Sequence, residues 1–207
     1  LARASEIAAD LGTEVAGLLA STIAELCEGQ VHELRYAFAL DRSEGDYLAS
    51  IAGKTASLLA TAARIGALVA GYPRDVIEAV TAFGHNYGMA FQVVDDLLDV
   101  VATDEQLGKP AGNDLVEGTY TLPVIRALAG SAGEELRELL GGPINDATRD
   151  RVKDLLKSDD SIAATRTTAT EFLDQATAAL DSLGNEPAVG TLRTTCSLLL
   201  DRLDSAG

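Results

Sequence analysis

The stretch PRDVIEAVTAFGHNYGMAFQVVDDLLDV, residues 73–100, decides the fold class that we expect for this chain. Apolar residues recur in it at intervals of three and four, which is the spacing of one face of an α-helix. Pro73 suits the first turn of such a helix, because proline lacks the N–H that would have no partner there. We therefore predict a helix over roughly 73–101.

The same spacing extends over most of the chain. Strand signals are nearly absent, since aromatic residues make up only 4% of the 207 and alternating apolar and polar runs are scarce. The pattern predicts an all-α fold with helices over roughly 13–40 and 44–70, the second opened by a capping arrangement of Ser43 and Asp46. Residues 103–119, rich in Gly and Asp, predict an ordered loop. We expect four or five further helices, with breaks near residues 141–146, 157–161 and 183–187.

Composition narrows the class of protein. A chain of 207 residues with 47% hydrophobic content can bury one core, and we expect a single domain. Its 32 acidic against 16 basic residues give a formal net charge of −16, which argues against nucleic acid and anionic membranes as partners. Cys27 and Cys196 lack metal-ligand spacing, so we expect a reducing, cytoplasmic environment. Arg64 interrupts the most apolar stretch, residues 55–73, and no transmembrane segment is predicted.

Four polar side chains share one face of the predicted helix at 73–101. Gln92, Asp95, Asp96 and Asp99 follow the i, i+3, i+4, i+7 spacing, and apolar residues occupy the rest of this segment. A helix that is apolar elsewhere should be buried, so the carboxylates are expected to line a cavity. Neighbouring carboxylates raise one another's pKa unless cations intervene, and Mg²⁺ takes such oxygen ligands together with water and substrate phosphate. A solvated polar face is the open alternative.

Two lysines lie close to this segment in the sequence. Lys54 stands among small and apolar residues, so its side chain either reaches the surface or points into a polar pocket. The letters GKT do not form a P-loop, because Leu48 stands where that motif needs glycine. Lys109, on a Gly/Pro loop, could contact a phosphate or be an ordinary exposed lysine. His32 and His85 have no metal-ligand partner at i+4, and we interpret both as structural or surface residues.

A family resemblance is carried by four segments in this order and at these separations: GKTASLL (53–59), GMAFQVVDDLLDV (88–100), LGKPAGNDLVEG (107–118) and TLPV (121–124). Together they resemble the trans-isoprenyl diphosphate synthases, also called polyprenyl synthetases. The resemblance implies an all-α helical bundle of the isoprenoid synthase type around a central cavity, with two aspartate-rich motifs facing each other across its mouth. This chain has the second motif. We expect the first before Leu1, so that residues 1–207 are the C-terminal two-thirds of one prenyl synthase domain.

The resemblance also implies a reaction and a set of site residues. An allylic prenyl diphosphate ionises with the help of Mg²⁺, the double bond of isopentenyl diphosphate attacks the carbocation, and a proton is lost. By resemblance, Asp95 is the principal Mg²⁺ ligand and, with Lys54, a catalytic residue. The resemblance also assigns Asp96 and Asp99 to the metal. It assigns the binding of the substrate diphosphate to Lys54, Thr55, Gln92 and Lys109.

One departure from the family pattern keeps alternatives open. Thr119 in EGTYTLP stands where the family often has lysine, so one phosphate contact is absent or supplied from elsewhere. Our leading hypothesis is a homodimeric, Mg²⁺-dependent prenyltransferase of isoprenoid biosynthesis. The alternatives are a non-catalytic family member that regulates or scaffolds a prenyl synthase, and a terpene cyclase of the same fold. The retained GKT and GKP segments favour elongation over cyclisation.

Overall fold

The structure is a computed structural model that describes residues 1–108 and 110–205. Every regular element in these residues is helical, so the prediction of an all-α fold is confirmed. The helices are α1 (Ala2–Asp10), α2 (Thr13–Arg35), α3 (Glu44–Ile51), the π-helix η1 (Ala52–Ala56), α4 (Ser57–Val69), α5 (Arg74–Val101), α6 (Asp104–Leu107), α7 (Asn113–Glu117), α8 (Leu122–Ala129), α9 (Gly133–Leu139), α10 (Asp146–Lys157), α11 (Ser161–Ala179), the 3₁₀ turn η2 (Asp181–Leu183) and α12 (Pro187–Asp204).

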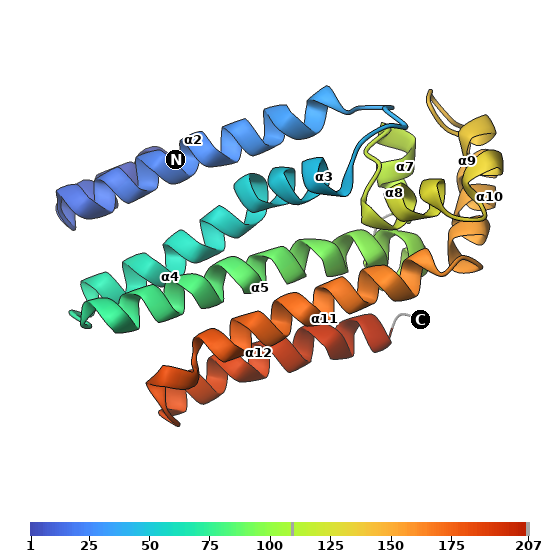
Figure 1. Cartoon of the computed structure of the whole chain (residues 1–207). Coiled ribbons are helices and arrows are strands. Elements are labelled where there is room, and N and C mark those ends of the chain that lie inside the picture. Colours follow the sequence, from blue (N-terminus) through green and yellow to red (C-terminus); the bar gives the residue numbers. More distant parts are fainter. Residues whose placement is uncertain (109, 206–207) are drawn as a thin grey trace.

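Helix α5 lies at the centre of the bundle. It packs against α4 on one side and α11 on the other, while α2 lies beyond α3 and α4 and α12 beside α11 (Figure 1). The short helices α7 to α10 gather at one end of the molecule, where the C-terminal half of α5 also lies (Figure 1). This arrangement places the aspartates of α5 at the junction between the long helices and the short ones.

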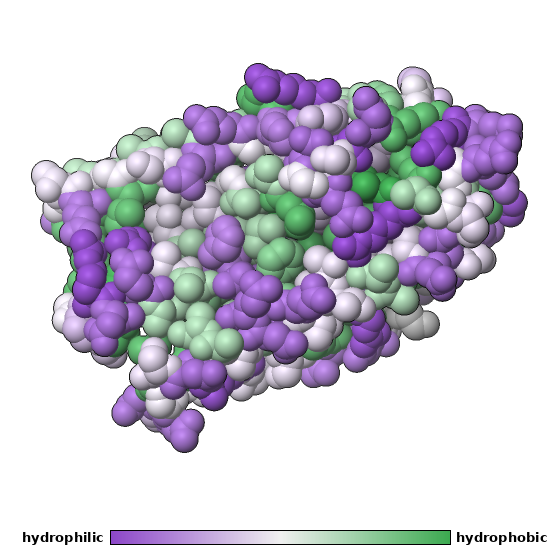
Figure 2. All heavy atoms as spheres, in the orientation of Figure 1, coloured by the Kyte–Doolittle hydropathy of each residue, from purple (hydrophilic) through white to green (hydrophobic). Residues whose placement is uncertain are grey.

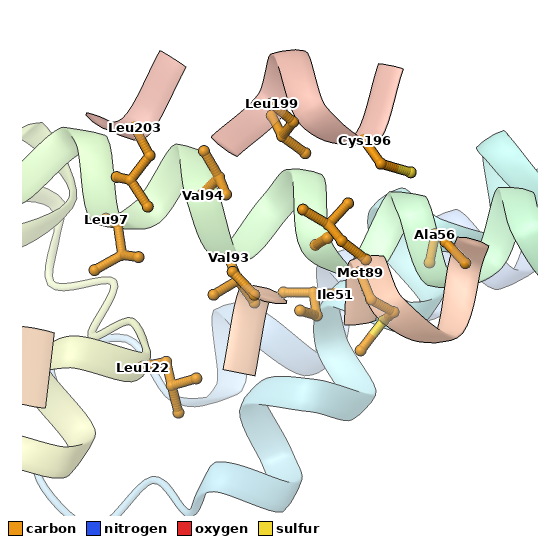
Figure 3. Close-up of a cluster of buried hydrophobic side chains, with 14 of the residues drawn as sticks. Ile51, Ala56, Met89, Val93, Val94, Leu97, Leu122, Cys196, Leu199 and Leu203 are labelled. Atoms are coloured by element: carbon orange, nitrogen blue, oxygen red, sulfur yellow. The ribbon is translucent and has the colours of Figure 1, made fainter. Parts of the chain in front are cut away.

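The core is built around the same half of α5. The side chains of Val93, Val94 and Leu97 have no exposed surface. Figure 3 shows Leu199 and Leu203 of α12 on one side of α5 and residues of other helices on the opposite side. Burying each such side chain stabilises the fold by about 1.5–3 kcal/mol. The segment that carries the aspartates is therefore held rigidly by apolar contacts on both sides.

Most predicted boundaries agree with the structure, and the differences have local causes. The helix predicted over 13–40 ends at Arg35, because Phe38 adopts a left-handed backbone (φ +60°) and its amide donates to the Gly118 carbonyl at 2.8 Å. The capping box of Ser43 and Asp46 is confirmed. The loop predicted over 103–119 contains two short helices, α6 and α7. Five α-helices and the 3₁₀ turn η2 follow it among the described residues, with breaks near the three predicted positions. The further break at residues 130–132, between α8 and α9, was not predicted.

Apolar groups also reach the surface. Figure 2 shows hydrophobic residues in the middle of the face seen in Figure 1, with hydrophilic residues along its margins. Large exposed apolar side chains include Val31 and Leu34 of α2, at 51% and 64% exposure. None of the helices among the described residues is long and apolar enough to cross a membrane.

Candidate functional site

A polar cavity of about 520 Å³ lies where α2, η1, α5 and α7 meet. Its acidic lining residues come from three helices: Glu33 from α2, Asp95 and Asp96 from α5, and Asp114 and Glu117 from α7. Its other described lining residues are Gln30, Leu34, Ala37, Lys54, Gln92, Thr119 and Thr121. Most of the stripe predicted on α5 therefore faces a cavity rather than open solvent, as the apolar surroundings of the helix indicated.

Asp96 is held by a chain of side-chain hydrogen bonds. It is only 4% exposed, and its Oδ2 accepts a hydrogen bond from the Tyr47 hydroxyl at 2.6 Å. Its Oδ1 accepts from Nε2 of Gln92 at 2.9 Å, and the Oε1 of Gln92 accepts in turn from the Thr55 hydroxyl at 2.7 Å. These contacts orient the carboxylate and connect η1 to α5.

The charge state of Asp96 depends on its surroundings. Burial first, and the nearby negative charge of Asp114 second, raise the pKa of Asp96 to about 8, although the hydrogen bonds from Tyr47 and Gln92 act in the opposite direction. A cation near this carboxyl group would offset both causes and favour the ionised form. A bound cation would therefore stabilise the ionised form of Asp96 in this site.

Lys54 is the basic residue among the described cavity lining. Its Nζ lies 2.7 Å from Oε2 of Glu33, and the amide of Gln30 donates to the same oxygen at 3.2 Å. The side chain of Lys54 is 33% exposed and that of Glu33 is 12% exposed. Of the two orientations that the sequence left open for Lys54, the structure has the one that points into a polar pocket.

The remaining predicted site residues are placed differently. The Oδ2 of Asp99 accepts from the amide of Asp114 at 3.2 Å, and the Asp99 carbonyl accepts from the amide of Gly112 at 2.7 Å. Asp99 is buried against the start of α7 and is not among the described residues that line the cavity. Lys109 lies outside the described residues. Thr119 lines the cavity, and its amide donates to the Asp114 carbonyl at 2.9 Å.

Helix α7 is positioned by the glycines at its two ends. Gly112 and Gly118 both adopt left-handed backbone, with φ of +77° and +74°, and only glycine does so without strain. A Cβ on Gly118 would also meet the ring of Phe38 at 2.5 Å. Left-handed turns therefore bound α7 at both ends, and its Asp114 and Glu117 line the cavity.

Several residues of the site were not predicted from the sequence. Tyr47, Asp114 and Glu33 act through partners that lie 49, 15 and 21 positions away in the chain. The letters GND within the resemblance segment at 107–118 could have pointed to Asp114. Nothing comparable distinguishes Glu33 or Tyr47 from other residues of an amphipathic helix.

A buried arginine, Arg42, packs against Tyr47, the residue that donates to Asp96. Arg42 is 4% exposed, and its guanidinium donates to the Tyr120 carbonyl and to the Ser50 hydroxyl, both at 3.0 Å. It also lies over the rings of Tyr36 and Tyr47, 5.8 and 5.5 Å from their centroids. An arginine in a polar loop is ordinarily exposed, so local sequence does not predict this burial.

Metal binding can be assessed from the donor set. Among the described residues, no three acidic, histidine or cysteine side chains converge into a ready-made metal site. The cavity nevertheless offers five carboxylates against one described lysine, and that lysine is paired with Glu33. Oxygen ligands of this kind suit a hard divalent cation that keeps several waters or substrate oxygens. The residues present therefore fit a cation that is completed by a bound phosphate group.

The sequence model of the polyprenyl synthetase family matches residues 1–158. The chain belongs to this family. Heptaprenyl diphosphate synthase component 2 of Geobacillus stearothermophilus is 38% identical over 193 residues, which are 93% of this chain and 60% of that protein. The matched part includes the four segments on which the resemblance was based, so that assignment is confirmed.

Solved structures of the family share the fold. A polyprenyl synthase from Caulobacter crescentus CB15, complexed with calcium and isoprenyl diphosphate, superimposes with a TM-score of 0.90 at 32% identity over 96% of this chain and 62% of that one. A decaprenyl diphosphate synthase from Rhodobacter capsulatus superimposes with a TM-score of 0.88 at 32% identity, over 98% of this chain and 64% of that one. The isoprenoid synthase type of bundle is thus confirmed. The chain spans about 60% of the length of the curated relative described above.

Proposed function

We propose that this chain is part of a cytoplasmic prenyl diphosphate synthase that joins an allylic prenyl diphosphate to isopentenyl diphosphate. The observation that carries the proposal is the acidic cavity lined by Lys54, Gln92, Asp95 and Asp96, which come from two helical segments that are distant in sequence. The hydroxyl of Thr55 donates to Gln92 at the edge of this group. The proposal is supported by the names of the relatives and by the isoprenyl diphosphate in the related Caulobacter structure.

The proposed roles follow from the geometry. Asp95 and Asp96 would hold Mg²⁺ at the cavity wall, and Asp99 would support them from the buried side. Mg²⁺ bound there would supply Lewis-acid stabilisation of the charge that develops on the leaving diphosphate. Tyr47 and Gln92 keep the carboxylate of Asp96 oriented.

The basic side of the site would bind the substrate. Lys54 exchanges its partner Glu33 for the diphosphate, and Thr55 assists through its hydroxyl. The allylic C–O bond breaks with its electron pair leaving on the diphosphate, the new C–C bond forms to isopentenyl diphosphate, and a proton is lost from the added unit. Preorganised charges of this kind stabilise a transition state more than they stabilise the bound substrate.

The cavity of these 207 residues supplies only part of such a site. The sequence contains one D-D-x-x-D pattern, at residues 95–99, and one cluster of carboxylates rarely encloses Mg²⁺. We therefore propose that the first aspartate-rich motif and the isopentenyl diphosphate site are contributed by residues outside this segment. On this view, residues 1–207 form a single domain with that part.

The assembly state has two candidates. We propose a homodimer, as the family resemblance implies. The second candidate is a catalytic or regulatory subunit that works with a different chain, and it is favoured by the relatives from Geobacillus stearothermophilus and Bacillus subtilis, whose names call them component 2. Light scattering combined with an activity assay of the purified full-length protein distinguishes these. Activity in a dimer of identical chains supports the first candidate, and activity that requires a second protein supports the other.

The function is tested by incubating the full-length protein with radiolabelled isopentenyl diphosphate and allylic primers of increasing length. We expect labelled prenyl products in the presence of Mg²⁺ and none after chelation. Residues 1–207 alone should give no elongation product. A full-length homodimer that binds allylic diphosphate but never forms product would favour a scaffold, and a cyclic hydrocarbon product would favour the cyclase.

A further inference from the structure

The helix that carries Lys54 contains one wide turn. In η1 the amide of Ser57 donates to the carbonyl of Ala52, five residues earlier, instead of the four of an α-helix. Single π turns inside α-helices occur frequently at functional sites. Here the wide turn spans Ala52–Ala56 and so includes both Lys54 and Thr55.

The wide turn changes which side chains are buried. Tyr47 and Ile51, four residues apart, face the core at 1% exposure each, and an uninterrupted α-helix would continue their stripe through Lys54 and Thr55. The buried stripe instead continues at Ala56 and Ala60, after a step of five residues. The extra residue therefore removes Lys54 from the stripe that faces the core.

Two glycine contacts clamp this turn between the neighbouring helices. A Cβ on Gly29 of α2 would lie 2.5 Å from the backbone nitrogen of Lys54 and 2.8 Å from the Ser50 carbonyl. On the opposite side, a Cβ on Gly88 of α5 would lie 2.6 Å from the Cα of Ala56. Backbone therefore meets backbone on both sides, and no larger residue fits without displacing a helix.

Each of these two glycines lies one helical turn before a residue that contacts Lys54 or Thr55. Gly29 is four residues before Glu33, whose carboxylate lies 2.7 Å from Lys54 Nζ. Gly88 is four residues before Gln92, which accepts from Thr55 at 2.7 Å. Residues four apart lie on one face of a helix. The close backbone contact of Gly29 therefore fixes the helix spacing at the pair of Lys54 and Glu33, and that of Gly88 fixes it at the pair of Thr55 and Gln92.

We propose that Gly29 and Gly88 are positioning residues, which hold the π turn so that Lys54 faces the cavity beside Glu33 and the Thr55 hydroxyl reaches Gln92. The part of this proposal that concerns substrate rests on the proposed function, because it assumes that Lys54 and Thr55 contact the allylic diphosphate. The part that concerns the turn stands on the backbone contacts alone.

The test replaces Gly29 by alanine in the full-length protein. Gly29→Ala should raise the KM for the allylic diphosphate about tenfold or more, the loss expected when a charge-assisted hydrogen bond is weakened, and leave the KM for isopentenyl diphosphate within about twofold. Gly17→Ala is the matched control, since Gly17 lies on the same helix and a Cβ there would meet nothing within 4 Å. It should leave both constants unchanged.

A second control separates positioning from general destabilisation. Gly133→Ala places its Cβ 2.3 Å from the Leu128 carbonyl, between the short helices α8 and α9. It should lower the melting temperature without changing the ratio of the two KM values. If Gly29→Ala behaves like Gly133→Ala, with an unchanged ratio, the positioning role is wrong.

Hydrogen exchange tests the turn independently of catalysis. In the free protein, amides of residues 52–57 should exchange faster in Gly29→Ala than in Gly17→Ala, and equal rates would overturn the clamp. If the wild type makes no prenyl product but this difference appears, the proposed function fails and the clamp stands. Should Gly29→Ala not fold, Gly88→Ala tests the same turn from α5, with the same two readouts.

Discussion

Helices α2 and α5 are the two longest in the described residues and have similar apolar spacing, yet they occupy different environments. In α5, the eight residues from Val93 to Val100 include seven buried ones, whereas α2 buries only Val15, Thr22 and Gly29 along its 23 residues. Asp96 on α5 is therefore desolvated and is held in one orientation by Tyr47 and Gln92, while Glu33 on α2 is paired with Lys54. The comparison shows that burial, rather than the residue type, raises the pKa of Asp96 and makes its ionisation sensitive to a nearby cation.

The largest expected effect concerns Asp95 of α5. In the full-length enzyme, Asp95→Asn should lower kcat about 10³-fold, because it removes a charged oxygen ligand from the site where the leaving diphosphate is stabilised. The melting temperature should hardly change. Asp174→Asn, at an exposed position of α11, is the control. Near-normal turnover at saturating Mg²⁺ would contradict the metal assignment and would remove the functional difference between α5 and α2.

The difference in burial predicts a difference in stability. Leu97→Ala on α5 should lower the free energy of unfolding by about 3 kcal/mol, since it leaves a cavity at a side chain with no exposure. Leu34→Ala on α2, at 64% exposure, should change it by less than about 0.5 kcal/mol. Urea denaturation of the two variants measures both values. Equal losses would mean that α2 is as deeply packed in solution as α5.

Lys54 tests the interaction between the two sides of the cavity. Lys54→Ala should weaken use of the allylic diphosphate by about 2 kcal/mol, or roughly thirtyfold in KM, as expected for a charge-assisted hydrogen bond. The KM for isopentenyl diphosphate should change little. Lys157→Ala, at the exposed end of α10, provides the control. Equal changes in both constants would argue against the assignment of Lys54 to the ionising diphosphate.

The last prediction is a pH dependence of stability that comes from a buried carboxyl group of α5. The pKa of Asp96 is raised from its ordinary value of 3.8 to about 8, so the folded state holds this proton more tightly than the unfolded state. The associated stability is fully present below about pH 4 and is lost as the pH rises towards 8. In metal-free buffer, Asp96→Asn should flatten this decline, which amounts to at most about 1.4 kcal/mol for each pH unit below 8. Thermal unfolding from pH 5 to 8.5 measures it, and an identical decline in both proteins would contradict it.

Local sequence was sufficient for the helices and for the acidic stripe. The spacing of apolar residues reports directly on which face of a helix is buried, and capping residues such as Ser43 and Asp46 act within three positions. The helices over Arg74–Val101 and after the loop at 103–119 were therefore predictable. So was the grouping of Asp95 and Asp96 on one face. The family itself followed from motifs that lie within single segments.

Tertiary structure alone decided which of these groups meet. Asp99 belongs to the same stripe as Asp95 but is drawn against the start of α7, because the left-handed turn at Gly112 brings the Asp114 amide to it. Glu33 became the partner of Lys54 through a helix crossing that only glycine at position 29 permits. Such contacts join residues far apart in the chain, and their free energy depends on the packing of whole helices rather than on any local pattern.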